Sequence, residues 1–418
     1  MSKVLSEATT AEETSLSQGS HINRGLVWIL SIACGFTAAN VYYIQPILAE
    51  IGHEFTASVS QVGLLVTFTQ IGYAAGLLLI VPLGDRHSRR TLIVTMLILV
   101  TLALVAMAIA PTLPFLMVAS LAIGFTTVIP QLIIPFAASL AHEKKRGHVV
   151  GSVMSGLLLG IMLSRTVSGF VNVQLGWRAM YWIAAGFMVL LAIVLRLMLP
   201  SDHPQSDMSY GRLLHSLWGL VRTEPALREA SLFGALAFAA FSAFWATLSF
   251  YLATPPYHYG SSVAGLFGLV GILGVLLGMP SGFLGDKIGA RKTTGISLGI
   301  LIVSFVIAWA TGQFLWGLGV GVVLLVLGTQ INQVSNQAVI YGLHPATRNR
   351  YNTIYMFTYY IGGALGSLLG TYGWSRAGWM GVCSTSLLLL LLALVVYAIN
   401  SWRKGAVSSR IGGKNGLG

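Results

Sequence analysis

Charged side chains are scarce in this sequence. Only 9% of the 418 residues are Asp, Glu, Lys or Arg, whereas 55% are hydrophobic. A soluble globular protein carries about 25% charged residues, and they cover its water-exposed surface. A lipid bilayer removes the need for such a surface, because the lipid-facing side chains can be apolar. The composition therefore predicts a membrane protein.

Acidic residues and cysteines are also few, and two common functional motifs are absent from the sequence. The chain has 12 acidic residues and two cysteines, and both Cys34 and Cys383 lie inside apolar segments. A disulfide is not expected there, and a metal site needs more ligands. The sequence has neither a Gly-x-x-x-x-Gly-Lys-Ser/Thr phosphate loop nor a His-Glu-x-x-His zinc motif. We therefore expect no metal, no cofactor and no enzymatic activity.

Twelve segments are apolar and long enough to cross a bilayer, which takes about 20 residues for a helix. They cover residues 26–47, 60–83, 92–110, 114–140, 149–172, 179–199, 229–252, 262–284, 294–311, 314–341, 351–373 and 376–399. The polar residues 1–24 are expected to form a cytoplasmic tail, and residues 401–418 a basic cytoplasmic tail.

The net charge of +12 indicates membrane topology rather than binding of nucleic acid. The basic residues lie in short clusters between the apolar segments, as topology signals do. If the N-terminus is cytoplasmic, 21 of the 24 Lys and Arg fall in cytoplasmic segments or at their edges, and Arg165, Arg178 and Arg376 are the exceptions. This asymmetry predicts that both termini are cytoplasmic, and no nucleic-acid partner is expected.

Short motifs recur roughly 200 residues apart. Pro82-Leu83-Gly84-Asp85-Arg86 matches Phe283-Leu284-Gly285-Asp286-Lys287, and Gly176-Trp177-Arg178 resembles Gly373-Trp374-Ser375-Arg376. Parallel repeats of this kind occur in transporters that bind substrate between two halves near the bilayer midplane. The repeats predict an all-α membrane protein with two pseudo-symmetric six-helix bundles. We expect the bundles at residues 25–199 and 229–400, joined by a cytoplasmic linker at 200–228.

The loop Gly84-Asp85-Arg86-His87-Ser88-Arg89-Arg90 resembles the signature loop of the major facilitator superfamily, and Gly282–Lys292 resembles its second copy. The segment Asn40–Pro46 and the Gly-Trp-Arg motif resemble the bacterial drug/proton-antiporter and sugar-efflux branch. This resemblance implies an efflux transporter of the inner membrane, expected to be a monomer, with protons as a candidate coupling ion. It also implies a conformational latch at the cytoplasmic ends of the helices, formed by Asp85, Arg86, Arg89, Arg90, Asp286, Lys287 and Arg291. The alternative is that these basic residues only determine topology.

Arg165 is the one basic residue well inside a predicted helix. An arginine at a helix centre costs roughly 2.5–3.5 kcal/mol on insertion scales, so it should face a partner or a wet cavity. In a cavity it would attract an anionic or strongly hydrogen-bonding substrate. The alternative is a structural role, in which it reaches the interface or pairs with Glu50 or Glu54. By contrast, no acid or histidine lies in the middle of a predicted helix, which disfavours cationic cargo.

Amide and aromatic side chains gather on several helices. Five amides lie within residues 330–337, and such side chains are costly in lipid unless they face a cavity or bond across helices. We predict a substrate cavity lined by Arg165, Asn40, Tyr43, Gln45, Gln131, Trp245, Gln330, Asn332, Gln333, Asn336, Tyr355 and Tyr359. For any one amide, a bond between helices is an equal alternative.

These features together predict a secondary active transporter that moves a small organic solute by alternating access. Efflux of a neutral or anionic cargo is favoured over a cationic one. An uptake permease of the same fold is one alternative. A membrane sensor that does not transport is a second, although it would need a larger domain outside the membrane.

Overall fold

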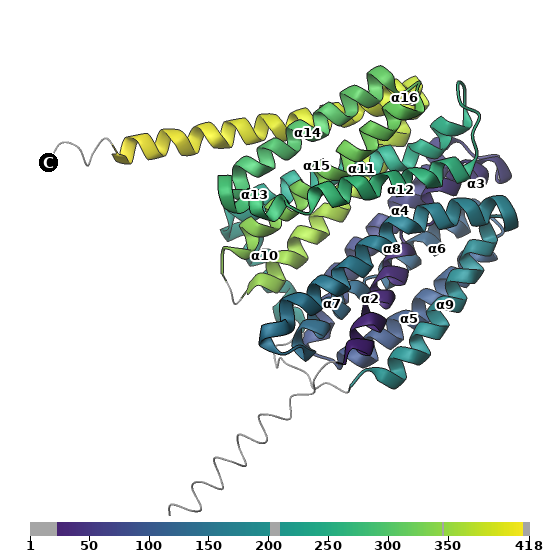
Figure 1. The fold of residues 1–418 in the computed structure, drawn as a ribbon, viewed down its shortest axis with the longest axis horizontal. Coiled ribbons are helices and arrows are strands. Elements are labelled where there is room, and N and C mark those ends of the chain that lie inside the picture. Colours follow the sequence, from purple (N-terminus) through teal and green to yellow (C-terminus); the bar gives the residue numbers. More distant parts are fainter. Residues whose placement is uncertain (1–22, 201–209, 345–346, 413–418) are drawn as a thin grey trace, which may run out of the picture.

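The computed structural model describes residues 23–200, 210–344 and 347–412. Within these ranges the chain forms helices and no strands (Figure 1). The first half, called the N-half, comprises α2 (Arg24–Ala39), η1 (Gln45–Ile47), α3 (Leu48–Glu54), α4 (Val59–Leu79), η2 (Val81–Asp85), α5 (Arg89–Ala108), α6 (Leu113–Thr126), α7 (Ile129–Leu140), η3 (Glu143–Lys145), α8 (Arg146–Leu175) and α9 (Trp177–Met198).

A linker helix, α10 (Tyr210–Thr223), precedes the second half. This C-half comprises α11 (Pro225–Ala253), α12 (Ser261–Gly278), α13 (Ser281–Ile288), α14 (Ala290–Thr311), α15 (Leu315–Tyr341) and α16 (Arg348–Gly412). The last element, α16, contains two helices joined at a kink, because Ala377 and Gly378 have non-helical backbone angles.

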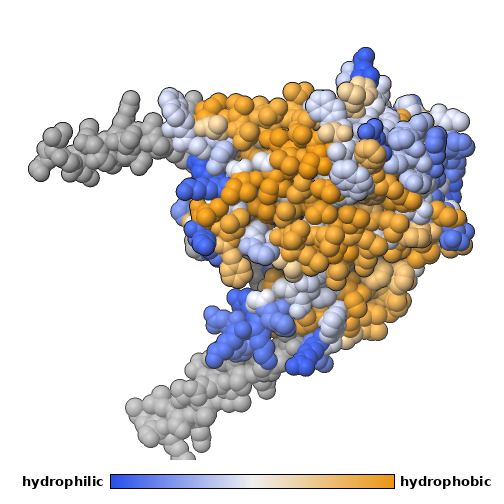
Figure 2. Space-filling model, turned by 45° about the horizontal axis from the view of Figure 1, so that its top comes forward, coloured by the Kyte–Doolittle hydropathy of each residue, from blue (hydrophilic) through white to orange (hydrophobic). Residues whose placement is uncertain are grey.

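All twelve predicted spans have a counterpart. Among the described residues, ten helices are long and apolar enough to cross a membrane, and the last of them, Arg348–Trp402, contains two spans across its kink. The first span is the short helix α2 with the turn and η1 that follow it. Figure 2 shows hydrophobic side chains over most of the visible surface, with hydrophilic patches toward its edges. Such a surface suits lipid contact.

The first span is not the continuous helix predicted for residues 26–47. Helix α2 ends at Ala39. Most of the backbone hydrogen bonds that follow join residues three apart, as in a 3-10 helix, for example Asn40 N–H to Thr37 O at 3.2 Å. Pro46 contributes to the break, because it has no N–H to continue an α-helix. The Ser168 hydroxyl donates to the carbonyl oxygen of Tyr43 at 2.6 Å, so one carbonyl in this broken segment is satisfied from α8.

Helices of the same half pack closely at glycines, in the same way in both halves. In the N-half, a Cβ added to Gly160 would lie 2.2 Å from Gly35 O, and one at Gly156 would lie 2.3 Å from Ser31 O. In the C-half, a Cβ on Gly366 would lie 2.0 Å from Ala239 O. Spans 1 and 5 therefore pack as spans 7 and 11 do, which is the repeat expected from the sequence.

Among the described residues, the two halves pack together extensively toward one end of the molecule. There α4 contacts α16, and α8 contacts α12. The Thr67 and Ser367 hydroxyls lie 2.8 Å apart, and the Thr166 hydroxyl donates to Gly265 O at 2.8 Å. We call this the closed end. The opposite end, called the basic end, is defined by Arg89, Arg146, Arg348 and Arg350, and in Figure 1 the halves spread apart toward α7 and α10.

Candidate functional site

A cavity of about 970 Å³ lies between the halves and extends to the basic end. Four arginines line it toward that end: Arg89, Arg146, Arg348 and Arg350. Among the described residues that line the cavity, none is Asp or Glu. The linker helix also contributes, since Leu217 lines the cavity. The space between the halves is therefore accessible from the basic end, and its described charged lining residues are arginines.

Four of the predicted cavity residues line this space. They are Gln131 from the N-half and Gln330, Gln333 and Tyr359 from the C-half. Because Gln131 on α7 and Gln330 on α15 come from corresponding places in the two halves, amide groups face the cavity from both sides. These groups can donate to and accept from a polar solute.

Arg165 lies beyond the inner limit of the cavity, fully buried. Its Nε donates to Gln45 Oε1 at 2.7 Å, and its Nη1 donates to Ile161 O at 3.2 Å. The guanidinium carbon lies 4.0 Å from the centre of the Trp245 ring and 4.7 Å from that of Tyr42. The contacts of Arg165 are thus with amide, carbonyl and aromatic groups, and neither of the pairings considered, with Glu50 or Glu54, is formed.

Five of the twelve predicted cavity residues are grouped in two buried clusters. Arg165, Gln45 and Trp245 form the first cluster. In the second, Asn336 donates to Asn332 at 2.9 Å, and Asn332 donates to the Ser297 hydroxyl at 3.0 Å, which ties α15 to α14. Asn332 thus forms the bond between helices, whereas Asn336 bonds within α15.

The remaining three predicted residues are buried in the walls of the two halves. Asn40 contacts the sulfur of Met188 at 3.5 Å, Tyr43 carries the carbonyl bonded by Ser168, and Tyr355 packs near Tyr359 with ring centroids 5.9 Å apart. None of the three is among the described residues that line the cavity. Their predicted role in binding stays a prediction.

Of the aromatic lining, the sequence predicted Tyr359 but not the residues around it. Tyr73 of the N-half and Tyr360 of the C-half face each other with ring centroids 4.1 Å apart, and Phe238 stacks on Tyr359 at 4.0 Å. All four line the cavity, as does Tyr42. The signals for Tyr42 and Tyr360 were their places in the Asn40–Pro46 motif and next to Tyr359, whereas Tyr73 lies in an apolar run without a distinguishing neighbour.

The residues of the predicted latch lie in the two loops at the basic end. Arg89 is buried and donates to Gly84 O at 3.3 Å and to the Ser139 hydroxyl at 3.5 Å. Arg90 donates to Arg196 O. In the second loop, Arg291 forms an ion pair with Glu229 at 3.0 Å. These contacts lie within a half, on each side of the open cavity.

The other predicted latch residues lie on the same two loops. Arg86, Asp286 and Lys287 are exposed. Asp85 ends η2, and its side chain lies outside the described part of the structure. The loops differ in backbone: Gly289 turns the second with φ +90°, whereas Ser88 turns the first with φ −53°. Ser88 occupies the place that Gly289 has in the second loop, and its negative φ shows that no glycine is needed there.

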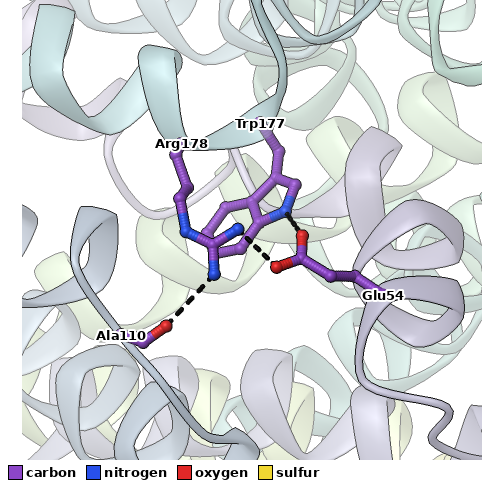
Figure 3. A network of polar contacts seen from close by, with 4 residues as sticks. All are labelled: Glu54, Ala110, Trp177 and Arg178. Carbon is purple, nitrogen blue, oxygen red and sulfur yellow. Dashed lines mark hydrogen bonds and ion pairs between the residues drawn. The ribbon is translucent and has the colours of Figure 1, made fainter.

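The Gly-Trp-Arg motif anchors the closed end of the N-half. Gly176 separates α8 from α9 with φ +82°, a backbone angle that favours glycine. This turn directs Trp177 Nε1 to Glu54 Oε2 at 2.6 Å and Arg178 to the same carboxylate, while Arg178 Nη2 also donates to Ala110 O at 3.2 Å (Figure 3). Burial raises the pKa of Glu54, but the bonds from Trp177 and Arg178 outweigh it and lower that pKa below its ordinary value.

Comparison with known proteins identifies the family. The family model described as Major Facilitator Superfamily matches residues 30–328 and 257–416. The chain therefore belongs to the Major Facilitator Superfamily. The uncharacterized transporter YgaY of Escherichia coli O157:H7 is 40% identical over 382 residues, covering 91% of this chain and 96% of that protein. The probable transporter SCO4007 of Streptomyces coelicolor is 32% identical over 379 residues, covering 90% and 87%.

Solved structures share the fold at low identity. A bacterial homolog of the human lysosomal transporter Spinster, inward-facing and occupied, has a TM-score of 0.71 at 17% identity, covering 90% of this chain and 96% of that one. A mutant of the nucleoside transporter NupG has a TM-score of 0.72 at 13% identity, covering 88% and 99%. The chain is thus a multi-pass membrane transporter with a small-molecule substrate, and not an enzyme.

Proposed function

We propose that the chain is a secondary active transporter that exports a small neutral or anionic organic solute by alternating access. The observation that carries this proposal is the cavity of about 970 Å³ between the halves, with four arginines and no acid among its described lining residues. Positive side chains facing a cavity attract anions and repel cations before any contact is made. The aromatic and amide lining suits an amphipathic solute.

Alternating access is supported by the difference between the two ends. The halves contact each other at the closed end and are separated by the cavity toward the basic end. The excess of basic residues there supports a cytoplasmic location for the basic end, so this conformation is proposed to be inward-facing. Closure of the basic end would bring the two loops of the predicted latch together. Efflux, a monomeric state and the inner membrane follow from the resemblance of Asn40–Pro46 and Gly176-Trp177-Arg178 to the efflux branch.

Protons are the proposed coupling ion, and Glu50 on α3 is the proposed group that binds them. Burial raises the pKa of this carboxyl, while hydrogen bonds with Ser261 and Asn172 partly oppose the effect. Asn172 belongs to the N-half and itself donates to the Ser261 hydroxyl of the C-half at 2.8 Å. A carboxyl at this contact can link its protonation to separation of the closed end.

The proposal is tested with purified protein in liposomes. A thermal-shift screen of neutral, anionic and cationic solutes first selects ligands, and transport of the selected solutes is then measured under proton gradients of either direction. We expect bound solutes to be neutral or anionic and their movement to follow a proton gradient. Failure of every solute to cross under any gradient would contradict transport, and preferred transport of cations would contradict the proposed cargo.

A further inference from the structure

Three residues with unpaired hydrogen-bond donors line one closely packed pocket beyond the inner limit of the large cavity, and in this conformation the pocket has no space for a water molecule. Arg165 Nη2, Trp245 Nε1 and Ser249 Oγ are buried and have no hydrogen-bond partner within the described part of the chain. All three residues line the same pocket, together with Gln45, Pro46, Leu248 and Ala264. Trp245 and Ser249 are four residues apart on α11, so they share a face of that helix. Three unpaired hydrogen-bond donors thus belong to residues that line this one pocket.

The charge of Arg165 is only partly compensated. Its contacts with Gln45, Ile161 and the rings of Tyr42 and Trp245 use Nε, Nη1 and the faces of the guanidinium. A buried charge that lacks an opposite charge is unfavourable, and a buried donor left unpaired adds a further cost. Both costs fall when an anion enters the pocket. If Arg165 had only a structural role, its N–H groups would be expected to have hydrogen-bond partners within the protein.

The pocket lies next to the large cavity, behind two aromatic rings. Tyr42 and Phe241 line the cavity, and their ring centroids lie 4.7 Å and 5.9 Å from the guanidinium carbon of Arg165. A solute that enters from the basic end therefore meets these rings before the donors. Because the pocket has no space for a ligand in this conformation, movement of the rings would have to open it before a charged group at the end of the solute could reach the donors.

We propose that Arg165, Trp245 and Ser249 form a carboxylate-binding subsite, and that the transported solute is a monocarboxylate with an apolar or aromatic body. A carboxylate accepts several hydrogen bonds with its two oxygens, which matches three donors around one positive charge. The single buried arginine suits a single negative charge. The apolar body would lie against Phe238, Phe241 and Tyr359, which line the cavity below.

The subsite joins the two halves. Arg165 and Gln45 belong to the N-half, whereas Trp245 and Ser249 belong to the C-half. A carboxylate held by donors from both halves favours the conformation in which these helices are close. Separation of the halves at the closed end would move Arg165 away from Trp245 and Ser249 and release the solute. Binding of the carboxylate would thereby be coupled to the movement of the two halves through the subsite itself.

This inference rests on the proposed transport function, and its test uses full-length purified protein. Binding of benzoate, phenylacetate and hexanoate is measured by calorimetry at pH 7, each beside its own primary amide. The acid and amide of a pair have similar size but differ in charge. We expect the wild-type protein to bind at least one acid about tenfold or more tightly than its amide, as a hydrogen bond to a charged group implies.

Variants then assign the selectivity to the three donors. Arg165→Gln is expected to remove the preference for the acid over the amide. Trp245→Phe keeps a ring beside Arg165 and removes only the N–H, and Ser249→Ala removes only the hydroxyl. Each should weaken acid binding several-fold and weaken amide binding less, because hydrogen bonds to a charged group are the stronger ones. Ser242→Ala is the matched control, because Ser242 is also a buried, unpartnered serine of α11 but does not line the pocket.

Two results would overturn the carboxylate subsite. The first is that no acid binds more tightly than its amide. The second is that Arg165→Gln, Trp245→Phe and Ser249→Ala still bind the acid more tightly than the amide and differ from wild type only in lower stability. That result would mean that Arg165 only packs the halves together. Transport of a neutral solute by the same protein would in either case leave the proposed function standing.

Discussion

The closed end and the basic end of this transporter differ in what lies between the halves. At the closed end the halves approach through small side chains and neutral hydrogen bonds, such as Thr67 with Ser367 and Thr166 with Gly265. At the basic end four arginines line the space between them. Neutral hydrogen bonds contribute about 0.5–1.5 kcal/mol each, so a few of them can hold one end closed and still separate during a cycle. Close packing, more than charge, is therefore expected to determine which end is closed.

The largest effect should come from adding bulk where backbones touch across the halves. A Cβ on Gly169 would lie 2.4 Å from Ser261 O. In Gly169→Val the closed end cannot approach as before, and overpacking costs about 1–3 kcal/mol. We expect the population of the closed end to fall about 5- to 150-fold and transport to fall with it. Spin labels at Gln174→Cys and Tyr259→Cys, one exposed residue from each half, report the distance between the halves.

Gly186→Val is the control for this change. Gly186 lies on the exposed face of α9, and an added Cβ meets nothing within 4 Å. The native Cys34 and Cys383 are buried and should not take up label. An unchanged label distance in Gly169→Val, with Gly186→Val also unchanged, would show that close packing does not hold the closed end.

The sequence predicted the arrangement of spans better than the contacts between them. Membrane length, basic loops and the repeated Gly-Asp-Arg/Lys motif depend on local composition, which is why twelve spans in two halves could be predicted. The break at residues 40–44 was missed, because only Pro46 marks it and the bonds that satisfy it come from α8. The proximity of Arg165 to Trp245 was not predictable either. Periodicity assigns a residue to a face of a helix but does not identify the helix opposite.

A smaller effect is expected from removing one hydrogen bond across the closed end. Thr67→Val preserves the shape of the side chain and removes the hydroxyl that lies 2.8 Å from that of Ser367. Ser367 keeps its bond to Ala364 O, so the loss should be near 1 kcal/mol, and the closed population should fall about fivefold. The same spin-label pair measures the shift. Thr101→Val is the control, because its hydroxyl bonds only within α5, to Leu97 O, and an equal shift in both variants would contradict the assignment.

The smallest effect is expected at Glu54, which also lies at the closed end but bonds within the N-half. Its carboxylate accepts from Trp177 and Arg178, and exposed ion pairs contribute only about 0.2–1 kcal/mol. Glu54→Gln should therefore lower the thermal midpoint slightly without changing the label distance between the halves. Because folding lowers the pKa of Glu54 below 4.5, its contribution is present above that pH and is lost as the pH falls through the lowered pKa. The variant should lack this acid-dependent loss in thermal unfolding. A changed distance between the halves in Glu54→Gln would mean that charge within the N-half also determines which end is closed, and the contrast between the two ends would need a different explanation.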